Sequence, residues 1–239
     1  MSITTEKTVR ELALEIPAAA RVFENLGIDY CCGGAHTLEQ ACQAANIPFE
    51  EAKVWLQDAR RTAERLARDW QTEPLAELIA HIKDTHHQYV RTKTGRLAPL
   101  FEKVCAVHAA NHPELPKLRD TFQSLAEELT THLFKEEMVL FPYIIRMEEA
   151  VIEKAPVVPA PFGTVRNPVA MMVREHNDAG DALRILRRES DNYTPPAEAC
   201  ASYQALYRAL AEFEADLHQH IHLENNILFP RAVEMEQGR

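Results

Sequence analysis

Two stretches of the chain repeat one another, and this repeat strongly limits the folds that the chain can adopt. HLFKEEMVLFP covers residues 132–142 and HIHLENNILFP covers residues 220–230. Each stretch carries a histidine, a glutamate four residues later and a closing LFP. Residues four apart lie on one face of an α-helix, so each repeat presents an imidazole beside a carboxylate. The chain is therefore predicted to have two matching halves, each with a His–Glu pair on one helix.

The apolar pattern around each pair indicates which face of the helix it occupies. The apolar stripe of the first repeat contains His132 and Glu136, and that of the second contains His220 and Glu224. Burial of an unpaired carboxylate costs on the order of several kcal/mol. No lysine or arginine interrupts either stripe to supply a positive charge. A bound cation is the expected partner of these two inward glutamates.

Each half also offers a histidine on its other long segment. In the second half this is His176, which lies on an apolar face. In the first half, the segment LIAHIKDTHHQYV contains His81, His86 and His87. The spacing within the repeat favours His87, whereas the apolar period of the segment slightly favours His86. These observations leave the choice open.

The combined donor set is four imidazoles and two carboxylates without a thiolate. This composition does not suit a structural zinc site, and six ligands around two shared carboxylates are more than one catalytic zinc ion uses. Manganese is a poorer fit to so much imidazole. A pair of iron ions bridged by the two glutamates, in the core of a helical bundle, is the interpretation that uses all six residues.

The rest of the chain predicts an all-α protein in two domains. Only seven glycines occur in 239 residues, apolar residues recur at spacings of three and four, and no strand-like alternation is visible. Residues 1–71 are expected to form a small helical N-terminal module, with capping boxes at TVRE and TLEQ and Gly27 ending the first helix. Residues 72–239 are expected to form a four-helix bundle that starts near Thr72 and Pro74. Its long helices are predicted at residues 75–108, 116–150, 168–190 and 196–236.

Composition narrows the partners and the compartment. With 36 acidic against 26 basic residues, the formal net charge is −10, which argues against nucleic acid or an anionic membrane as the main partner. No apolar run approaches the roughly 20 residues that span a bilayer, and the N-terminus has no signal-peptide core. Five scattered cysteines without a CxxC pair fit a reducing compartment, so a cytoplasmic protein is expected.

Cys31 and Cys32 stand together before Gly33 and Gly34 in the stretch DYCCGG. A disulfide between adjacent cysteines closes a strained ring and is easily reduced, and the two glycines allow another group to approach closely. The two thiols are therefore candidate reactive residues, with a turn that contains two incidental cysteines as the alternative.

The remaining cysteines, and several polar residues near the candidate ligands, are expected to have simpler roles. Cys42, Cys105 and Cys200 are expected to pack as small apolar residues. Glu137, Glu175, His218 and His222 are expected to lie at the solvated surface. For Glu137 and Glu175, which neighbour candidate ligands in the sequence, the alternative is a contact that supports a ligand. His108 and His112 flank a turn, where they are expected to act as caps.

Together these motifs resemble the Repair of Iron Centres family, a group of di-iron proteins that repair iron-sulfur clusters. The resemblance covers essentially the full chain, through DYCCGG, TLEQA, PLAELIAHI, HLFKEEMVLFP, REHNDAG and HIHLENNILFP. It implies a hemerythrin-like bundle with a non-haem di-iron centre, and its register selects His87 over His86. One departure is Asn177, where an aspartate is common, and this position touches no ligand. The ligands that the resemblance implies are His87, His132, Glu136, His176, His220 and Glu224.

The resemblance also implies a function. The chain is expected to help restore iron-sulfur clusters damaged by nitric oxide or oxidants, by supplying or mobilising iron. Its expected partners are damaged iron-sulfur proteins, with nitric oxide or oxygen species as small ligands. The alternatives are a di-iron enzyme that reduces nitric oxide or nitrite, and a hemerythrin-like module that binds or senses oxygen or nitric oxide. The sequence leaves open whether the chain is an enzyme and whether it forms a homodimer.

Overall fold

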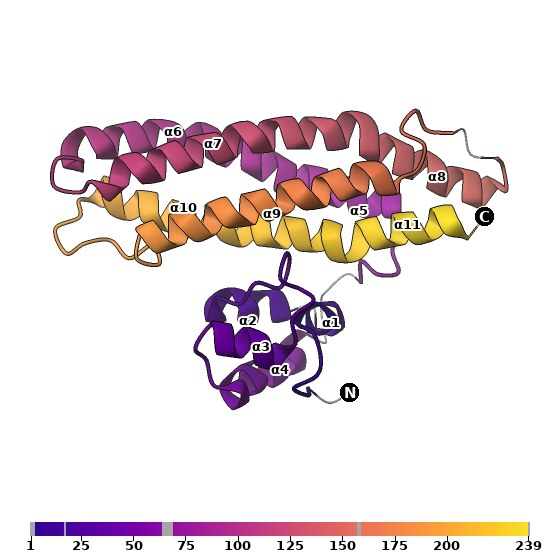
Figure 1. The fold of residues 1–239 in the computed structure, drawn as a ribbon, viewed down its shortest axis with the longest axis horizontal. Helices are drawn as coiled ribbons and strands as arrows, with labels where there is room; N and C mark the ends of the chain where they lie inside the picture. Colours follow the sequence, from indigo (N-terminus) through magenta and orange to yellow (C-terminus); the bar gives the residue numbers. More distant parts are fainter. Residues whose placement is uncertain (1–2, 17, 64–68, 157–158, 239) are drawn as a thin grey trace.

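The computed structural model describes residues 3–16, 18–63, 69–156 and 159–238. Every regular element in these ranges is helical, which confirms the predicted all-α class. A small group of short helices lies against the middle of a long bundle, so the molecule has two parts of unequal size (Figure 1). The division of the chain into domains after residue 71 stays a prediction.

The described part of the N-terminal module contains four helices: α1 (Val9–Glu15), α2 (Ala19–Leu26), α3 (Leu38–Ala44) and α4 (Phe49–Ala63). Both predicted capping boxes are present, with Thr8 paired to Glu11 and Thr37 paired to Gln40. The two caps lie side by side, because Thr8 and Thr37 form a single antiparallel bridge. The expectation that Gly27 ends the first helix is wrong. Gly27 ends α2 in the left-handed conformation (φ 64°), because α1 already stops where the backbone becomes extended.

In the described residues, four long helical rods form the bundle. The rods lie side by side (Figure 1). The first rod packs against the second and the fourth, and the second also packs against the third. The predicted segments agree with these rods to within a few residues, except that the fourth rod begins at Ala201 and not at residue 196. The rods are α5 (Leu75–His81), η1 (Ile82–His87) and α6 (Gln88–His108); α7 (Glu114–Lys135), η2 (Glu136–Leu140) and α8 (Phe141–Glu153); α9 (Arg166–Glu189); and α10 (Ala201–Leu223), η3 (Glu224–Leu228) and α11 (Phe229–Gln237).

One turn of π-helix interrupts three of the four rods. The turn η1 ends at His87, η2 begins at Glu136 and η3 begins at Glu224. A π turn accommodates an extra residue within an α-helix, and such turns are frequent at functional sites. The third rod, α9, is α-helical throughout. All three π turns therefore coincide with residues of the predicted metal site.

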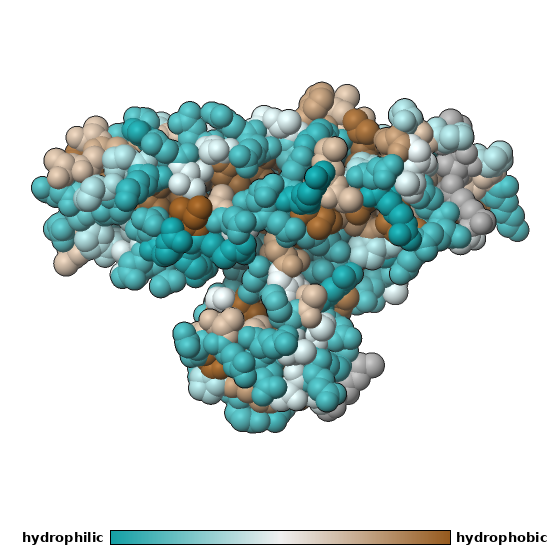
Figure 2. Space-filling view, in the orientation of Figure 1, coloured by the Kyte–Doolittle hydropathy of each residue, from teal (hydrophilic) through white to brown (hydrophobic). Residues whose placement is uncertain are grey.

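Apolar side chains form one core in the module and two in the bundle. Along α7, Leu129 and Leu133 belong to one bundle core, while Leu140 in the following π turn belongs to the other. His132 and Glu136 therefore lie where the two bundle cores meet. Polar side chains cover most of the face shown in Figure 2. Among the residues described, no helix combines the length and the apolar character needed to cross a membrane.

A glutamate from the helix after each LFP motif binds the N-terminus of the first rod of its own half. Glu148 accepts hydrogen bonds from the backbone N–H groups of Leu75 and Ala76, at 2.6 and 2.8 Å. Glu236 occupies the matching position in the second repeat and accepts from the backbone N–H of Val165 at 2.9 Å. The start of the bundle differs slightly from the prediction, because Pro74 is the N-cap of α5 and makes no side-chain cap. The carboxylate of Glu148 satisfies the N–H groups instead.

Polar contacts join the module to the fourth rod. Asn226 donates from Nδ2 to the backbone carbonyl of Tyr30 at 3.2 Å and to Nδ1 of His222 at 2.8 Å. Arg10 donates to the backbone carbonyl of Asn226 at 3.3 Å. The expectation that His222 is solvated is wrong, because the module lies over it and leaves 4% of it exposed. Burial, with a smaller effect of the positive charge of Arg10, lowers the pKa of His222 to about 4.

His218 is a second contact between the module and the fourth rod. Its Nδ1 lies 3.0 Å from Oε1 of Glu24 in α2, and both side chains are largely covered. Burial alone would lower the pKa of His218, but the hydrogen bond and the charge of Glu24 raise it. The expected solvated position of His218 is therefore also wrong.

Candidate metal centre

Six buried side chains converge in the middle of the bundle. They form two groups of four, and within each group the potential ligand atoms lie within 4.8 Å of one another. Both groups contain both glutamates, and the six residues are between 0% and 3% exposed. The structure therefore brings together all six residues of the predicted ligand set. One group is His87, Glu136, His220 and Glu224, and the other is His132, Glu136, His176 and Glu224.

The histidines face one another in pairs through their Nε2 atoms. The Nε2 atoms of His87 and His220 are 3.1 Å apart, and those of His132 and His176 are 3.0 Å apart. Each pair contains one histidine from each half of the repeat. Each pair thus directs two ring nitrogens at one small volume beside the shared glutamates.

Three of the four histidines are oriented by a hydrogen bond from the opposite ring nitrogen. Nδ1 of His87 lies 2.7 Å from Glu137, and Nδ1 of His132 lies 2.8 Å from Glu175. Nδ1 of His176 lies 2.8 Å from the side-chain oxygen of Asn225. Because these acceptors hold the proton on Nδ1, they leave the Nε2 lone pair directed at the cluster. Within the described residues, Nδ1 of His220 has no hydrogen-bond partner.

Glu137 and Glu175 therefore support the cluster, and their expected solvation is wrong. Each carboxylate is also paired with a cation at the surface, Glu137 with Arg91 and Glu175 with Lys135. Sequence periodicity could not show this, because Glu175 lies on α9 while the histidine that it contacts lies on α7. The acidic residues directly beside two candidate ligands were the available signal.

The two central glutamates are fully buried carboxylates. Among the described residues, none of their side-chain oxygen atoms has a hydrogen-bond partner. The nearest groups that can carry a positive charge are imidazoles, at 3.3 Å between His132 and Glu136 and 3.1 Å between His220 and Glu224. Buried polar atoms of native proteins are almost always satisfied, so four orphan oxygens at one place indicate a ligand that satisfies them.

The pKa values of residues in the cluster also indicate that positive charge is favoured there. Burial disfavours a charged His132, but the Glu136 carboxylate raises its pKa to about 9. Despite its burial, the pKa of Glu224 is held well below the usual value, first by His220 and then by the imidazoles of His176 and His87 beside it. The protein thus keeps the Glu224 carboxylate ionised in an apolar interior, which requires compensating positive charge.

The closing LFP of each repeat also has a role in the cluster. The ring of Phe141 stacks on His87 with centroids 5.6 Å apart, and the ring of Phe229 stacks on His176 at 5.9 Å. Each phenylalanine thus covers the histidine on the first rod of its own half. The repeat therefore encodes an imidazole, a carboxylate and the apolar wall beside them.

The neighbouring histidines of the first rod take other positions. His86 is buried, but its Nδ1 lies 3.1 Å from Asp216 and its ring stacks on His220, so it is not among the clustered groups. His81 stacks on Trp70 outside the cluster. The apolar period pointed to His86 because it assumes an uninterrupted α-helix. The π turn η1 shifts the inward position by one residue, to His87.

Cys31 and Cys32 lie in the turn that faces the bundle. Cys32 Sγ lies 3.5 Å from the backbone carbonyl of His176, and a Cβ on Gly180 would approach that sulfur to 3.5 Å. Cys31 is more buried, and a hydrogen bond with Cys32 together with burial raises its pKa well above the usual value. Asp29 accepts from the backbone N–H groups of both cysteines. Cys32 thus lies beside the backbone of one residue of the candidate site, and the two thiols have different surroundings.

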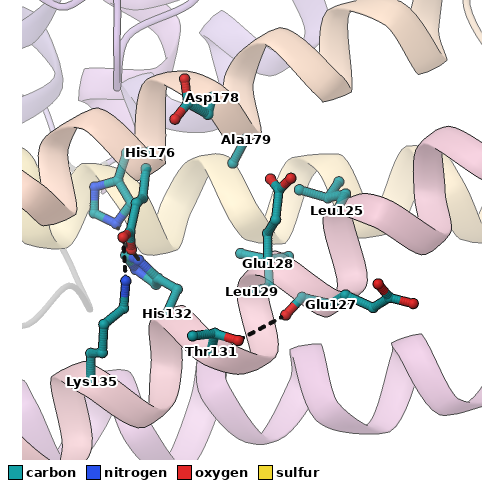
Figure 3. A pocket seen from close by; sticks show the side chains of 11 residues that line it. Leu125, Glu127, Glu128, Leu129, Thr131, His132, Lys135, His176, Asp178 and Ala179 are labelled. Carbon is teal, nitrogen blue, oxygen red and sulfur yellow. Dashed lines mark hydrogen bonds and ion pairs between the residues drawn. The ribbon is translucent and has the colours of Figure 1, made fainter.

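An open pocket of about 480 Å³ reaches the cluster from one side, between α7 and α9. His132 and His176 lie at one end of it and Leu125 lies toward the other (Figure 3). The pocket gives small molecules a route to one of the two histidine pairs. Its acidic lining residues are Glu127, Glu128, Glu175 and Asp178.

The other cysteines and the histidines beside the turn lie away from the cluster. Cys42 and Cys105 are buried as expected, but Cys200 is exposed, which contradicts its expected packing. Cys200 is the N-cap of α10, and its Sγ lies 3.2 Å from Nε2 of His108. His112 contacts Glu114 through Nδ1 at 3.0 Å. The caps expected from His108 and His112 are not seen at the start of α7, where Pro113 makes no side-chain cap.

Comparison with known proteins agrees with this arrangement. The family model described as the hemerythrin HHE cation binding domain matches residues 78–232, and a domain of unknown function named ScdA_N matches residues 5–59. Proteins named iron-sulfur cluster repair protein YtfE from Citrobacter koseri, Escherichia coli and Shigella boydii are each 37% identical over 229 residues. These alignments cover 95% of this chain and 97% of each relative.

The chain belongs to the Repair of Iron Centres family. The resemblance seen in the sequence motifs is thereby confirmed, and so is the hemerythrin-type bundle. In this Repair of Iron Centres protein, the buried histidine and glutamate groups of the cation-binding domain form a candidate site for two metal ions.

Proposed function

We propose that this chain repairs iron-sulfur clusters damaged by nitric oxide or oxidants, and that it does so with two iron ions held in the bundle. The observation that carries the proposal is the sharing of both glutamates by the two groups of ligand atoms. Two carboxylates within reach of both groups are the arrangement of a bridged pair of metal ions in a helical bundle. The names of the relatives support the repair function.

The donor chemistry fits iron. Two nitrogens bound in neighbouring positions of an octahedral ion, each at about 2.1 Å, lie about 3.0 Å apart. The observed Nε2 separations of 3.1 Å and 3.0 Å agree with this value. Imidazole and carboxylate without thiolate suit non-haem iron. In this proposal the ligands are His87, His132, Glu136, His176, His220 and Glu224, with the two glutamates as bridges.

The surrounding residues have separate tasks in this proposal. Glu137 and Glu175 hold protons on Nδ1 of His87 and His132, which keeps the Nε2 lone pairs free to bind metal. Phe141 and the matching phenylalanine of the second repeat exclude water from the histidines. Iron bound here supplies Lewis-acid and redox chemistry toward nitric oxide and oxygen species. The pocket between α7 and α9 admits such small molecules.

Cys31 and Cys32 are the proposed reactive thiols. The contact of Cys32 with the backbone carbonyl of His176, where the module meets the bundle, supports this role. The proposed clients are damaged iron-sulfur proteins, and the proposed location is the cytoplasm, without nucleic acid as a partner.

Metal analysis with Mössbauer spectroscopy tests the di-iron site. The protein is expected to contain two irons per chain with a coupled di-iron signal. Glu136→Leu and Glu224→Leu are each expected to lose stable binding of two irons, because each removes a shared carboxylate. Glu234→Leu, the same substitution at an exposed position of α11, is the matched control. Two irons per chain in both core variants would refute the ligand assignment.

A repair assay tests the function itself. The iron-loaded protein is expected to restore the cluster of a nitric oxide-damaged client, and Cys31→Ser with Cys32→Ser is expected to reduce this activity while the di-iron spectrum is kept. Catalytic loss of nitric oxide with an electron donor, without cluster restoration, would identify a reductase instead. A stable adduct with a diatomic gas and no further reaction would identify a binding module.

A further inference from the structure

A second group of potential metal ligands lies outside the bundle cluster. Asp29, Cys31 and Cys32 each offer one ligand atom, and these three atoms lie within 4.8 Å of one another. The two sulfur atoms are 3.9 Å apart, and Cys31 Sγ lies 3.4 Å from Asp29 Oδ1. The group contains two thiol donors, which the bundle cluster lacks.

These separations are those of a tetrahedral site. Two thiolates bound at about 2.3 Å to one tetrahedral ion lie about 3.8 Å apart. A thiolate and a carboxylate oxygen at about 2.1 Å from the same ion lie about 3.6 Å apart. The observed values of 3.9 Å and 3.4 Å both fall close to these separations. The ligand atoms of Cys32 and Asp29 lie within 4.8 Å of one another, so one ion can bind all three side chains once this third separation is about 3.6 Å.

The backbone holds this arrangement in place before any ion binds. Asp29 Oδ1 accepts from the N–H groups of Cys31 and Cys32 at 3.1 and 2.9 Å, which fixes the turn that carries the thiols. A Cβ on Gly33 would lie 3.0 Å from the carbonyl oxygen of Asp29, so the turn needs a residue without a side chain there. The turn is also fixed to the bundle, because Arg184 in α9 lies 3.5 Å from Asp29 Oδ2.

A divalent ion neutralises most of the negative charge of this group. Two thiolates and one carboxylate carry three negative charges, so one negative charge remains after a divalent ion binds. The guanidinium of Arg184 offsets part of this remaining charge from the rim of the site, since it also pairs with Asp181. Binding releases the two thiol protons to solvent and involves no change in oxidation state.

We propose that Asp29, Cys31 and Cys32 form a mononuclear site for a thiophilic divalent cation. Three protein ligands leave the fourth tetrahedral position for water or for a donor from another protein, as in sites that exchange their ligands. The contact of Cys32 with His176 places this site beside the bundle cluster. If the proposed repair function holds, the site is where iron is held between the di-iron pair and the client.

Cobalt(II) is the probe for this site, because thiolate ligands give it a charge-transfer absorption that imidazole and carboxylate ligands do not. The full-length protein, with two irons already bound in the bundle, is titrated with cobalt(II) without oxygen. One cobalt per chain is expected to bind with thiolate charge transfer, while iron stays at two per chain.

Variants assign the ligands. Cys31→Ser and Cys32→Ser are each expected to lose most of the charge-transfer band. Asp29→Asn is expected to weaken cobalt binding by about tenfold or more, because the amide oxygen still supports the turn but the charged ligand is lost. Cys42→Ser, in the core of the same module, and Cys200→Ser, at an exposed position, are the matched controls and are expected to keep the band.

Three results would overturn the proposal: no thiolate band at one equivalent of cobalt, a band that survives the loss of both Cys31 and Cys32, or one cobalt shared by two chains in sedimentation. These readouts do not depend on repair activity. If the bundle variants of Glu136 and Glu224 kept two irons while cobalt still bound the thiols, the di-iron proposal would fail and the thiol site would stand. Full cluster repair by a variant that cannot bind cobalt would show that iron does not pass through this site.

Discussion

The sulfur of Cys32 and the backbone carbonyl of His176 are 3.5 Å apart, although 144 residues separate them in the chain. This contact joins the N-terminal module to a residue of the bundle cluster. Gly180 lies beside the sulfur of Cys32, and a Cβ at this glycine would be 3.5 Å from it, an ordinary van der Waals contact. The thiols therefore lie beside the backbone of the cluster in the conformation described, and a large domain movement is not needed to bring them there.

The first prediction concerns the choice between two adjacent histidines. His87→Leu is expected to prevent stable binding of two irons, because it removes an imidazole that faces His220 through Nε2. His86→Leu is the matched control, since it is the same substitution in the next buried residue, and it is expected to retain most of the iron. Iron per chain after desalting measures both. Greater iron loss in His86→Leu would show that the register of η1 is wrong.

The second prediction concerns the carboxylates behind the histidines. Glu137→Ala and Glu175→Ala are each expected to lower metal affinity by about 10-fold to 100-fold, because each leaves an Nδ1 without its acceptor. Competition with a chelator of known affinity measures the change. Glu212→Ala, which breaks a surface ion pair with Lys93, is the control and is expected to leave the affinity unchanged. Unchanged affinity in both test variants would return these two glutamates to a surface role.

The third prediction concerns pH and the docking of the module. The pKa of His218 is raised by Glu24 despite burial, so the charged pair stabilises the folded state fully below the unfolded pKa of about 6.5 and less as pH rises through the folded pKa. Glu24→Gln is expected to cost about 1 to 2 kcal/mol near pH 6, and this difference from the wild type should shrink toward alkaline pH. Urea unfolding over a pH series measures it. The exposed substitution Glu39→Gln should give no such trend, and a difference that grows with pH would contradict the assignment.

The fourth prediction concerns the glutamates that bind helix N-termini. Glu148→Ala and Glu236→Ala are each expected to cost about 1 kcal/mol of stability, because each leaves backbone N–H groups unsatisfied. For a chain of this size the loss corresponds to a fall in Tm of about 2 to 4 °C. Calorimetry at matched metal content measures it. Glu149→Ala, at the exposed neighbouring position, should leave Tm unchanged, and an equal fall in that variant would point to a general loss of helix stability.

Much of the fold followed from local patterns. Thr8 and Thr37 were predicted as caps because a capping box depends on residues three apart in sequence, and both caps are present. The four rods followed from apolar periodicity and proline positions. Gly27 was assigned to the wrong helix because the sequence was read as one long first helix, whereas the chain forms α1 and α2.

In the candidate site, too, residues that share one helix were predictable from the sequence, whereas contacts between distant segments were not. The inward faces of His132, Glu136, His220 and Glu224 were readable because each pair lies on one helix. The solvated position predicted for His222 was wrong because the module that covers it comes from a distant part of the chain. The same holds for Glu175, which meets its histidine across two helices.

The sequence by itself determined the helical class, the two matching halves and a set of imidazoles and carboxylates on inward faces, because helical geometry converts spacing directly into a shared face. Only the tertiary structure decided that His87 and not His86 faces the cluster, since one π turn changes the register of every residue after it. Only the tertiary structure placed Cys32 beside His176, since that contact depends on how the module packs on the bundle.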